Sequence, residues 1–168
     1  RLFGGDDAIA RYIKSEIRRR TQLPCTIAIA PNKLVAKIAA DQAKPDGYRR
    51  VGAGEEAAFL RPLPIGKLPG AGPRTCEALE GMGVTTVGAL VDLPEAALLA
   101  AFGPMGHALR EAALGRSTAP VVTESIPKSI SRETTFEEDL LDWQRIERIL
   151  IYLAERAAYA LREAGMET

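Results

Sequence analysis

The chain has 168 residues, of which 46% are hydrophobic and 26% are charged, a composition typical of a soluble globular protein with one ordinary domain or two small ones. Lys and Arg together number 22, as do Asp and Glu, so a net charge of zero gives no long-range attraction to nucleic acid, and any DNA binding has to be local. No apolar run approaches the ~18 residues of a membrane span, and no signal-peptide pattern is present. We therefore expect a protein that neither spans a membrane nor is secreted. Cys25 and Cys76 lack the spacing of metal ligands and are expected to be reduced thiols in a cytoplasmic protein.

The first part of the chain predicts alternating helices and strands. Ile9, Ile13 and Ile17 recur at a spacing of four, which indicates an amphipathic helix that covers a sheet. The apolar run LPCTIAIA predicts a buried strand, Asn32 is placed to cap the next helix, and the KPDG turn ends that helix. Together these elements predict a partial α/β layer, too small for a complete sheet domain. The expected elements are a helix over 6–20, a strand over 25–30, a helix over 33–44, a strand over 48–51 and a helix over 55–60.

The second part, residues 64–117, has the texture of a compact all-α unit. Glycine-containing turns of two to four residues separate short segments with helical spacing. The helices are expected at 73–81, 85–91, 94–101 and 104–114.

The third part begins near Ala119. Residues 126–136 carry β-branched and hydroxyl side chains in near alternation, which predicts a strand with one exposed face. After it, residues 141–164 have apolar side chains at helical spacing, with arginines on the opposite side, and predict one long helix. No complete sheet is predicted for this helix to pack on.

The turn LPGAG, residues 68–72, raises the question of phosphate binding. A dinucleotide-binding fingerprint is excluded because Thr75 stands where the third glycine should be and no buried strand precedes the turn. The pattern fits a helix-hairpin-helix, in which Pro73 occupies the first helical position and free N–H groups at the positive end of the helix dipole hold a phosphate. FGPMG, residues 102–106, resembles a degenerate second copy. A tight helix connection without a ligand is the alternative.

Three segments, in this order and at these separations, resemble the Y-family translesion DNA polymerases, most closely the bacterial DNA polymerase IV type. They are IAIAPNKLVAKIAADQAKPDG, KLPGAGPRTCEALEGMGVTTVGAL and KSISRETTF. The resemblance spans essentially the whole chain and implies an α+β fold in three parts. Residues 1–64 correspond to the C-terminal part of an α/β palm, 65–118 to a helical thumb with helix-hairpin-helix motifs, and 119–168 to an incomplete α/β little finger.

The resemblance also implies a catalytic apparatus that this sequence lacks. Members of the family bind Mg²⁺ through three palm carboxylates, two of them in an S-x-D-E motif, and no such motif is present here. The adjacent acids Glu55–Glu56 and Glu137–Asp139 are expected to be structural, since acids are common near helix N-termini. We therefore expect no catalytic or metal-binding residue in this chain, a parent protein that is a DNA-directed DNA polymerase, and a piece that is inactive alone.

The resemblance assigns binding roles residue by residue. Lys44 in the KPDG turn matches a lysine that contacts the triphosphate of the incoming nucleotide, although a solvated lysine at a helix C-terminus is the alternative. For Lys33 and Lys37 a simple solvated face is the preferred interpretation, and for His107 a surface or capping role. The residues matched to DNA-backbone contacts are Gly70, Gly72, Arg74 and Thr75 in the thumb hairpin, and Lys128, Ser129, Ser131 and Arg132 in the little finger, where an ordinary edge strand is the alternative.

The implied partners are primer-template DNA and a deoxynucleoside triphosphate, and a sliding clamp stays an open question. Two rival interpretations remain. One is a non-catalytic, damaged-DNA-binding relative of the family. The other is a helix-hairpin-helix module of another repair enzyme, which would leave the first and third of the three segments unexplained.

Overall fold

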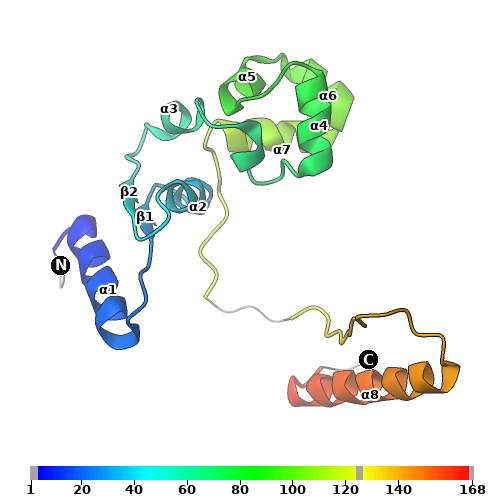
Figure 1. Ribbon diagram of the computed structural model, residues 1–168. Coiled ribbons are helices and arrows are strands. Elements are labelled where there is room, and N and C mark those ends of the chain that lie inside the picture. Colours follow the sequence, from blue (N-terminus) through cyan, green and yellow to red (C-terminus); the bar gives the residue numbers. More distant parts are fainter. Residues whose placement is uncertain (1–3, 124–126, 167–168) are drawn as a thin grey trace. The chain divides into compact units, whose positions relative to one another are not determined.

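Residues 4–123 and 127–166 are described by the computed structural model of the chain, and they fall into two compact units (Figure 1). The first unit is Arg1–Val121 and the second is Val122–Thr168. The structure is rich in helices and has one small parallel sheet, in agreement with the α+β class. The finer division into three parts, with boundaries after residues 64 and 118, stays a prediction.

The first unit begins with the predicted α/β layer. Two short strands pair in parallel, with Ile27 opposite Tyr48, and a helix connects them. That helix starts after Asn32, whose side-chain oxygen accepts a hydrogen bond of 3.0 Å from the backbone N–H of Val35 and so caps the first turn. The elements are α1 (Asp6–Thr21), β1 (Ile27–Ile29), α2 (Lys33–Gln42) and β2 (Tyr48–Arg50). The four predicted elements are thus present, with shorter strands than expected.

The rest of the first unit is helical, as predicted. Its elements are α3 (Glu56–Leu60), the 3₁₀ turn η1 (Ile65–Lys67), α4 (Pro73–Gly81), α5 (Val87–Asp92), α6 (Glu95–Phe102) and α7 (Pro104–Ala113). One hydrophobic core runs through the helices and the α/β layer, from Val35 in α2 through Leu60 and Leu79 to Leu109 in α7. Because this core is continuous, the end of α2 and the turn between η1 and α4 are held in one folded body.

The second unit contains the predicted long helix, α8 (Trp143–Glu163), which begins where the Asp142 carboxylate accepts a hydrogen bond of 3.1 Å from the N–H of Arg145. The strand predicted over residues 126–136 is wrong for its described part, since residues 127–136 form no strand. Residue 126 lies outside the described residues. A strand needs a neighbour to complete its ladder of hydrogen bonds, and the described part of this unit offers no second strand. The described part of this unit also offers no sheet on which α8 could pack, and α8 has no buried residue.

Among the described residues, no helix is both long enough and apolar enough to span a membrane.

Candidate functional site

A cavity of about 480 Å³ lies in the first unit, between the C-terminal end of α2 and the segment that leads from η1 into α4. On the α2 side its lining includes Lys37, Asp41 and Lys44, and on the other side Lys67 and Pro69. The cavity therefore brings the predicted nucleotide lysine together with the start of the LPGAG turn. The sequence alone did not place these two segments side by side.

The charge of this cavity is positive. The Lys44 ammonium lies 2.7 Å from one oxygen of the Asp41 carboxylate, and the Lys37 ammonium lies 3.5 Å from the other. The hydrogen bond from Lys44 and the nearby positive charges lower the pKa of Asp41, which therefore stays ionised at neutral pH. The residues that line the cavity thus carry three ammonium groups and one carboxylate, and the surplus of two positive charges suits a polyanion such as a phosphate chain.

Lys67 is the site residue that the sequence analysis missed. Its side chain is exposed, and within the described residues it forms neither an ion pair nor a hydrogen bond. Its ammonium is free to bind a ligand, whereas those of Lys37 and Lys44 already share Asp41. The available signal was its position directly before the LPGAG turn, which by itself does not show that the residue faces Lys44.

The turn that carries Lys44 is tightly defined. A Cβ atom on Gly47 would lie 1.8 Å from the carbonyl oxygen of Ala43, so only glycine allows the backbone to approach so closely at this point. Asp46 adopts a positive φ of 49°, and the Lys44–Pro45 peptide is cis. Lys44 itself projects outward with its side chain 65% exposed, within reach of solvent and of a ligand.

The LPGAG turn places free backbone donors at the start of α4. Leu68 and Ala71 are buried, and the Ala71 N–H donates to the Leu68 carbonyl at 3.0 Å, so the turn is anchored by its apolar residues. Gly70 has a positive φ of 96°, which a side chain would make unfavourable. Within the described residues, the backbone N–H groups of the four predicted residues form no hydrogen bond: Gly70, Gly72, Arg74 and Thr75. Such free donors, together with the dipole of α4, form an anion-binding arrangement.

The second predicted hairpin differs from the first. Gly103, with a φ of 58°, is the single residue between α6 and α7, and Pro104 is the first residue of α7. Gly106 lies inside α7 rather than in the turn. A Cβ atom on Gly106 would come 2.3 Å from the Leu98 carbonyl oxygen. The resemblance between the two turns is therefore partial, and a second helix-hairpin-helix stays a prediction.

The four residues predicted in the second unit are exposed and do not form the expected strand. They are Lys128, Ser129, Ser131 and Arg132. Arg132 donates to the carbonyl of Ser131 at 2.9 Å. They belong to a different unit from the cavity and are not part of its lining.

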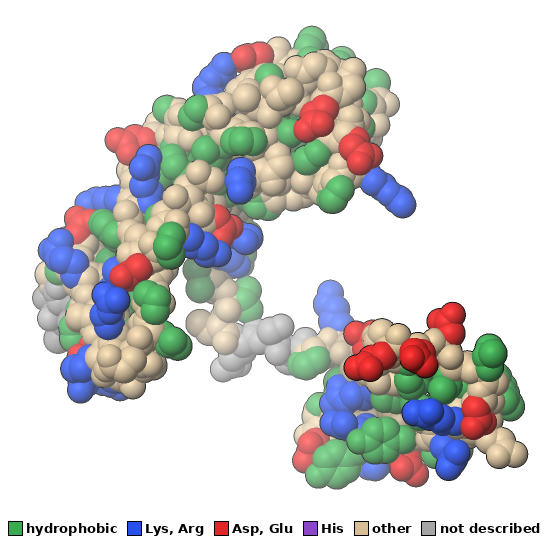
Figure 2. Space-filling view, in the orientation of Figure 1, with side chains coloured by type: hydrophobic (Ala, Val, Ile, Leu, Met, Phe, Trp, Pro, Cys, Tyr) green, Lys and Arg blue, Asp and Glu red, His purple; other side chains and the backbone are tan. Residues whose placement is uncertain are grey.

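His107 lies on the surface, with its Nδ1 atom 2.9 Å from the Glu95 carboxylate. Both side chains are more than half exposed, in line with the surface role expected for this residue. The face drawn in Figure 2 carries side chains of both charges. In the described part of the chain, no group of three or more His, Cys, Asp or Glu side chains could hold a metal ion.

Two family models match the ends of the chain. The model of the impB/mucB/samB family matches residues 1–41, and the model of the C-terminal domain of the same family matches residues 127–168. The chain is similar to proteins named DNA polymerase IV, with 41% identity over 167 residues in Dehalococcoides mccartyi and 41% over 160 residues in Methanoculleus marisnigri. These alignments cover 99% and 95% of this chain but 43% and 44% of the relatives, so the chain spans less than half their length.

Two solved structures resemble this one. A ternary complex of the protein Dbh has a TM-score of 0.66 and 27% identity, covering 94% of this chain and 48% of that one. A Y-family DNA polymerase chimera built from Dbh and Dpo4 has a TM-score of 0.79 and 28% identity, covering 93% of this chain and 46% of the other. The similarity therefore includes the stretch between the two family-model matches.

Proposed function

We propose that this chain binds the phosphates of primer-template DNA and of an incoming deoxynucleoside triphosphate. The chain belongs to the impB/mucB/samB family and corresponds to part of a Y-family polymerase of the DNA polymerase IV type. The parent protein would be a DNA-directed DNA polymerase for translesion synthesis and repair. The observation that carries the proposal is the cavity that Lys44 shares with the residues leading into the LPGAG turn.

The nucleotide is assigned to the lysines of the cavity. A triphosphate is a mobile chain of negative charges, and compact ammonium groups on flexible stems can follow it. Lys44 is exposed and Lys67 is unpaired within the described residues, so both are available to such a ligand. Asp41 would compete for Lys44 in the absence of nucleotide and would release it on binding, at little cost because exposed ion pairs are weak.

The DNA backbone is assigned to the start of α4. Backbone N–H groups bind phosphate oxygens without reading the base sequence, as non-specific binding of primer-template DNA requires. They need no net positive charge on the protein, which removes the apparent conflict with a formal charge of zero. We assign Gly70, Gly72, Arg74 and Thr75 to this contact, as one helix-hairpin-helix.

A second set of DNA contacts is assigned to the other unit. Lys128 and Arg132 supply positive charge, and Ser129 and Ser131 supply hydroxyl groups, all of them exposed. We propose that this segment lies along template phosphates when DNA is bound.

The transfer of the nucleotide would need groups outside those described here. Phosphoryl transfer of this kind uses two metal ions held by shared carboxylates, and Mg²⁺ is the ion expected for the parent enzyme. The carboxylates among the described residues do not fit such a site, because no three metal-binding side chains come together. The residues of this chain would therefore bind and orient substrates, and the piece would be inactive alone.

The rival assignment to an isolated helix-hairpin-helix module is not favoured. Such a module would account for residues 64–117, whereas similarity to DNA polymerase IV proteins extends over 99% of the chain.

The proposal is tested in the full-length parent by changing Lys44 to Ala. Loss of one phosphate contact is expected to raise the KM for the deoxynucleoside triphosphate about tenfold while the affinity for primer-template DNA stays the same. Arg19→Ala is the matched control, because Arg19 is 66% exposed and pairs with a carboxylate one helical turn away, as Lys44 does, but lies in α1. An unchanged KM in the Lys44 variant would refute the nucleotide assignment.

A further inference from the structure

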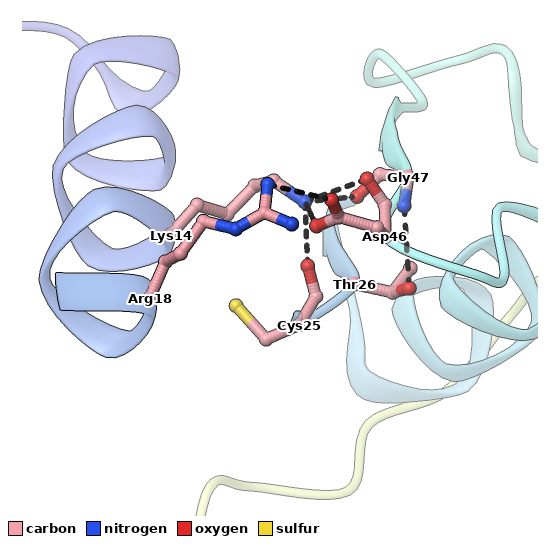
Figure 3. A network of polar contacts seen from close by, with 6 residues as sticks. All are labelled: Lys14, Arg18, Cys25, Thr26, Asp46 and Gly47. Carbon is pink, nitrogen blue, oxygen red and sulfur yellow. Dashed lines mark hydrogen bonds and ion pairs between the residues drawn. The ribbon is translucent and has the colours of Figure 1, made fainter. Parts of the chain in front are cut away.

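The turn that carries Lys44 is bound mainly by one side chain of α1, that of Lys14. The Lys14 ammonium donates hydrogen bonds to three backbone carbonyl oxygens, those of Cys25 at 2.5 Å, Asp46 at 2.8 Å and Gly47 at 3.2 Å, and it lies 2.7 Å from the Asp46 carboxylate (Figure 3). Its side chain is 23% exposed. Every other lysine or arginine that forms an ion pair among the described residues has a larger exposed fraction of its side chain.

This arrangement differs from an ordinary surface ion pair. A pair between two flexible side chains fixes little, since both ends can move together. Lys14 instead contacts main-chain atoms of two segments, the residues before β1 and the turn after α2, and so fixes the position of the backbone itself. Arg18, one turn further along α1, adds only a contact of 3.3 Å to the Asp46 carboxylate from a side chain that is 65% exposed.

The turn also forms hydrogen bonds with the first residue of β1 and with the residue before it. The N–H of Ile27 donates to the Gly47 carbonyl at 3.2 Å, and the N–H of Gly47 donates to the Thr26 hydroxyl at 3.3 Å. Both of these hydrogen bonds are long. The link to α1 through Lys14 is shorter and charged, so it is expected to dominate the placement of the turn.

We infer that Lys14 is a positioning residue for Lys44: by binding the carbonyl groups of Cys25, Asp46 and Gly47, it fixes the turn from which Lys44 reaches the phosphates of the nucleotide. The inference rests on the proposed function of Lys44. Lys44 lies two residues before Asp46, so a shift of the turn moves the origin of its side chain. A flexible lysine can compensate for a small shift only by adopting fewer of its rotamers, which weakens its contact with a ligand across the cavity.

The test is a double-mutant cycle in the full-length parent protein. Lys14→Met retains an unbranched side chain one atom shorter than lysine and removes its charge and donors. We expect it to raise the KM for the deoxynucleoside triphosphate about fivefold and to change kcat less than about twofold. In a Lys44→Ala background the same change should have no further effect on KM, because Lys14 acts through Lys44. Lys14→Arg, which retains the charge and the donors, should restore most of the loss.

A second variant guards against a loss of folding. Asp46→Asn removes the carboxylate that Lys14 binds but leaves the three carbonyl contacts, and it should raise KM in the same direction by a smaller factor. Arg19→Met serves as the control, since Arg19 pairs with Glu16 inside α1 and, among the described residues, no hydrogen bond or ion pair joins its side chain to the turn. Thermal unfolding and DNA affinity are measured for every variant.

The possible outcomes separate the inference from the proposed function. If Lys44→Ala raises KM but Lys14→Met does not, the inference is wrong and the nucleotide assignment stands. If Lys14→Met raises KM equally in the presence and absence of Lys44, then Lys14 acts by another route and the inference is again overturned. If Lys44→Ala itself has no effect, the nucleotide assignment and the inference based on it both fail.

Discussion

Asp46 connects the local electrostatics of the site to the stability of the chain. The hydrogen bond from Lys14, reinforced by the charges of Lys14 and Arg18, lowers the pKa of this carboxyl group below its ordinary value of 3.8. The folded state therefore favours the ionised form. The contribution of Asp46 to stability is fully present above pH 3.8 and is lost as the pH falls through the lowered pKa of the folded state.

This linkage predicts a pH-dependent difference between the protein and its Asp46→Asn variant. At about pH 6 the variant should melt at a lower temperature, and the difference should shrink steadily below about pH 4, because protonation removes the same charge from the unchanged protein. Thermal unfolding followed by circular dichroism across this range measures it. Glu16→Gln provides the comparison: hydrogen bonds and charges of Arg19 and Arg20 lower the pKa of Glu16 from 4.5 to about 2, so its difference should begin to shrink below about pH 4.5 and be lost near pH 2. A difference for Asp46→Asn that is independent of pH would contradict this explanation.

At the scale of the helices and strands, the local signals in the sequence were sufficient for most of the first unit. The spacing of isoleucines, the cap at Asn32 and the proline at position 73 act over a few residues, and α1, α2 and α4 begin at or within one residue of the expected positions. The strand predicted near residues 126–136 failed because a strand depends on partners elsewhere, which local alternation does not supply. That Lys67 and Lys44 line the same cavity was missed for a similar reason, since it arises from packing between distant segments.

The contact between α6 and α7 offers a test at this scale. Gly106 allows α7 to approach the backbone of α6, where a Cβ atom would lie 2.3 Å from the Leu98 carbonyl oxygen. Gly106→Ala should therefore separate the two helices and lower the free energy of unfolding by about 2 kcal/mol or more. Urea denaturation of the chain measures this change.

Gly81→Ala is the control for that experiment. Gly81 lies in α4, and nothing would come within 4 Å of a Cβ atom there. Its replacement should be neutral or stabilise the protein by up to about 1 kcal/mol, because alanine has the higher helix propensity. Equal stabilities for the two variants would show that α6 and α7 do not depend on the close approach at Gly106.

At the scale of the whole molecule, a chain with no net charge has to bind phosphates through local arrangements. In the first unit we propose the lysines of the cavity and the free N–H groups at the start of α4 for this role. The described residues of the core also lie in this unit, whereas α8 of the second unit has no buried residue. Of the proposed phosphate-binding groups, the sequence analysis predicted Lys44 and the four residues at the start of α4, interpreted Lys37 as part of a solvated face and missed Lys67. That Lys44 and the start of the LPGAG turn line one cavity depends on packing around the common core and required the structure.

Binding of DNA by the LPGAG turn is the central claim, and Gly72 allows it to be tested without disturbing the fold. Gly72 has an ordinary negative φ, and nothing would come within 4 Å of a Cβ atom there, so Gly72→Val is expected to fold. The added side chain would nevertheless occupy the space in front of the free N–H groups, where a phosphate has to approach. A loss of DNA binding in this variant would therefore report on the contact itself.

The most direct measurement is the fluorescence anisotropy of a labelled primer-template duplex titrated with the chain and with Gly72→Val over a range of salt concentrations. We predict that the chain binds duplexes of different sequence equally, that its affinity falls steeply with salt, and that the variant binds at least about tenfold more weakly at low salt while unfolding at a similar temperature. Equal binding by the two proteins, or no binding by the folded chain at low salt, would contradict the claim and leave LPGAG as a simple connection between helical segments.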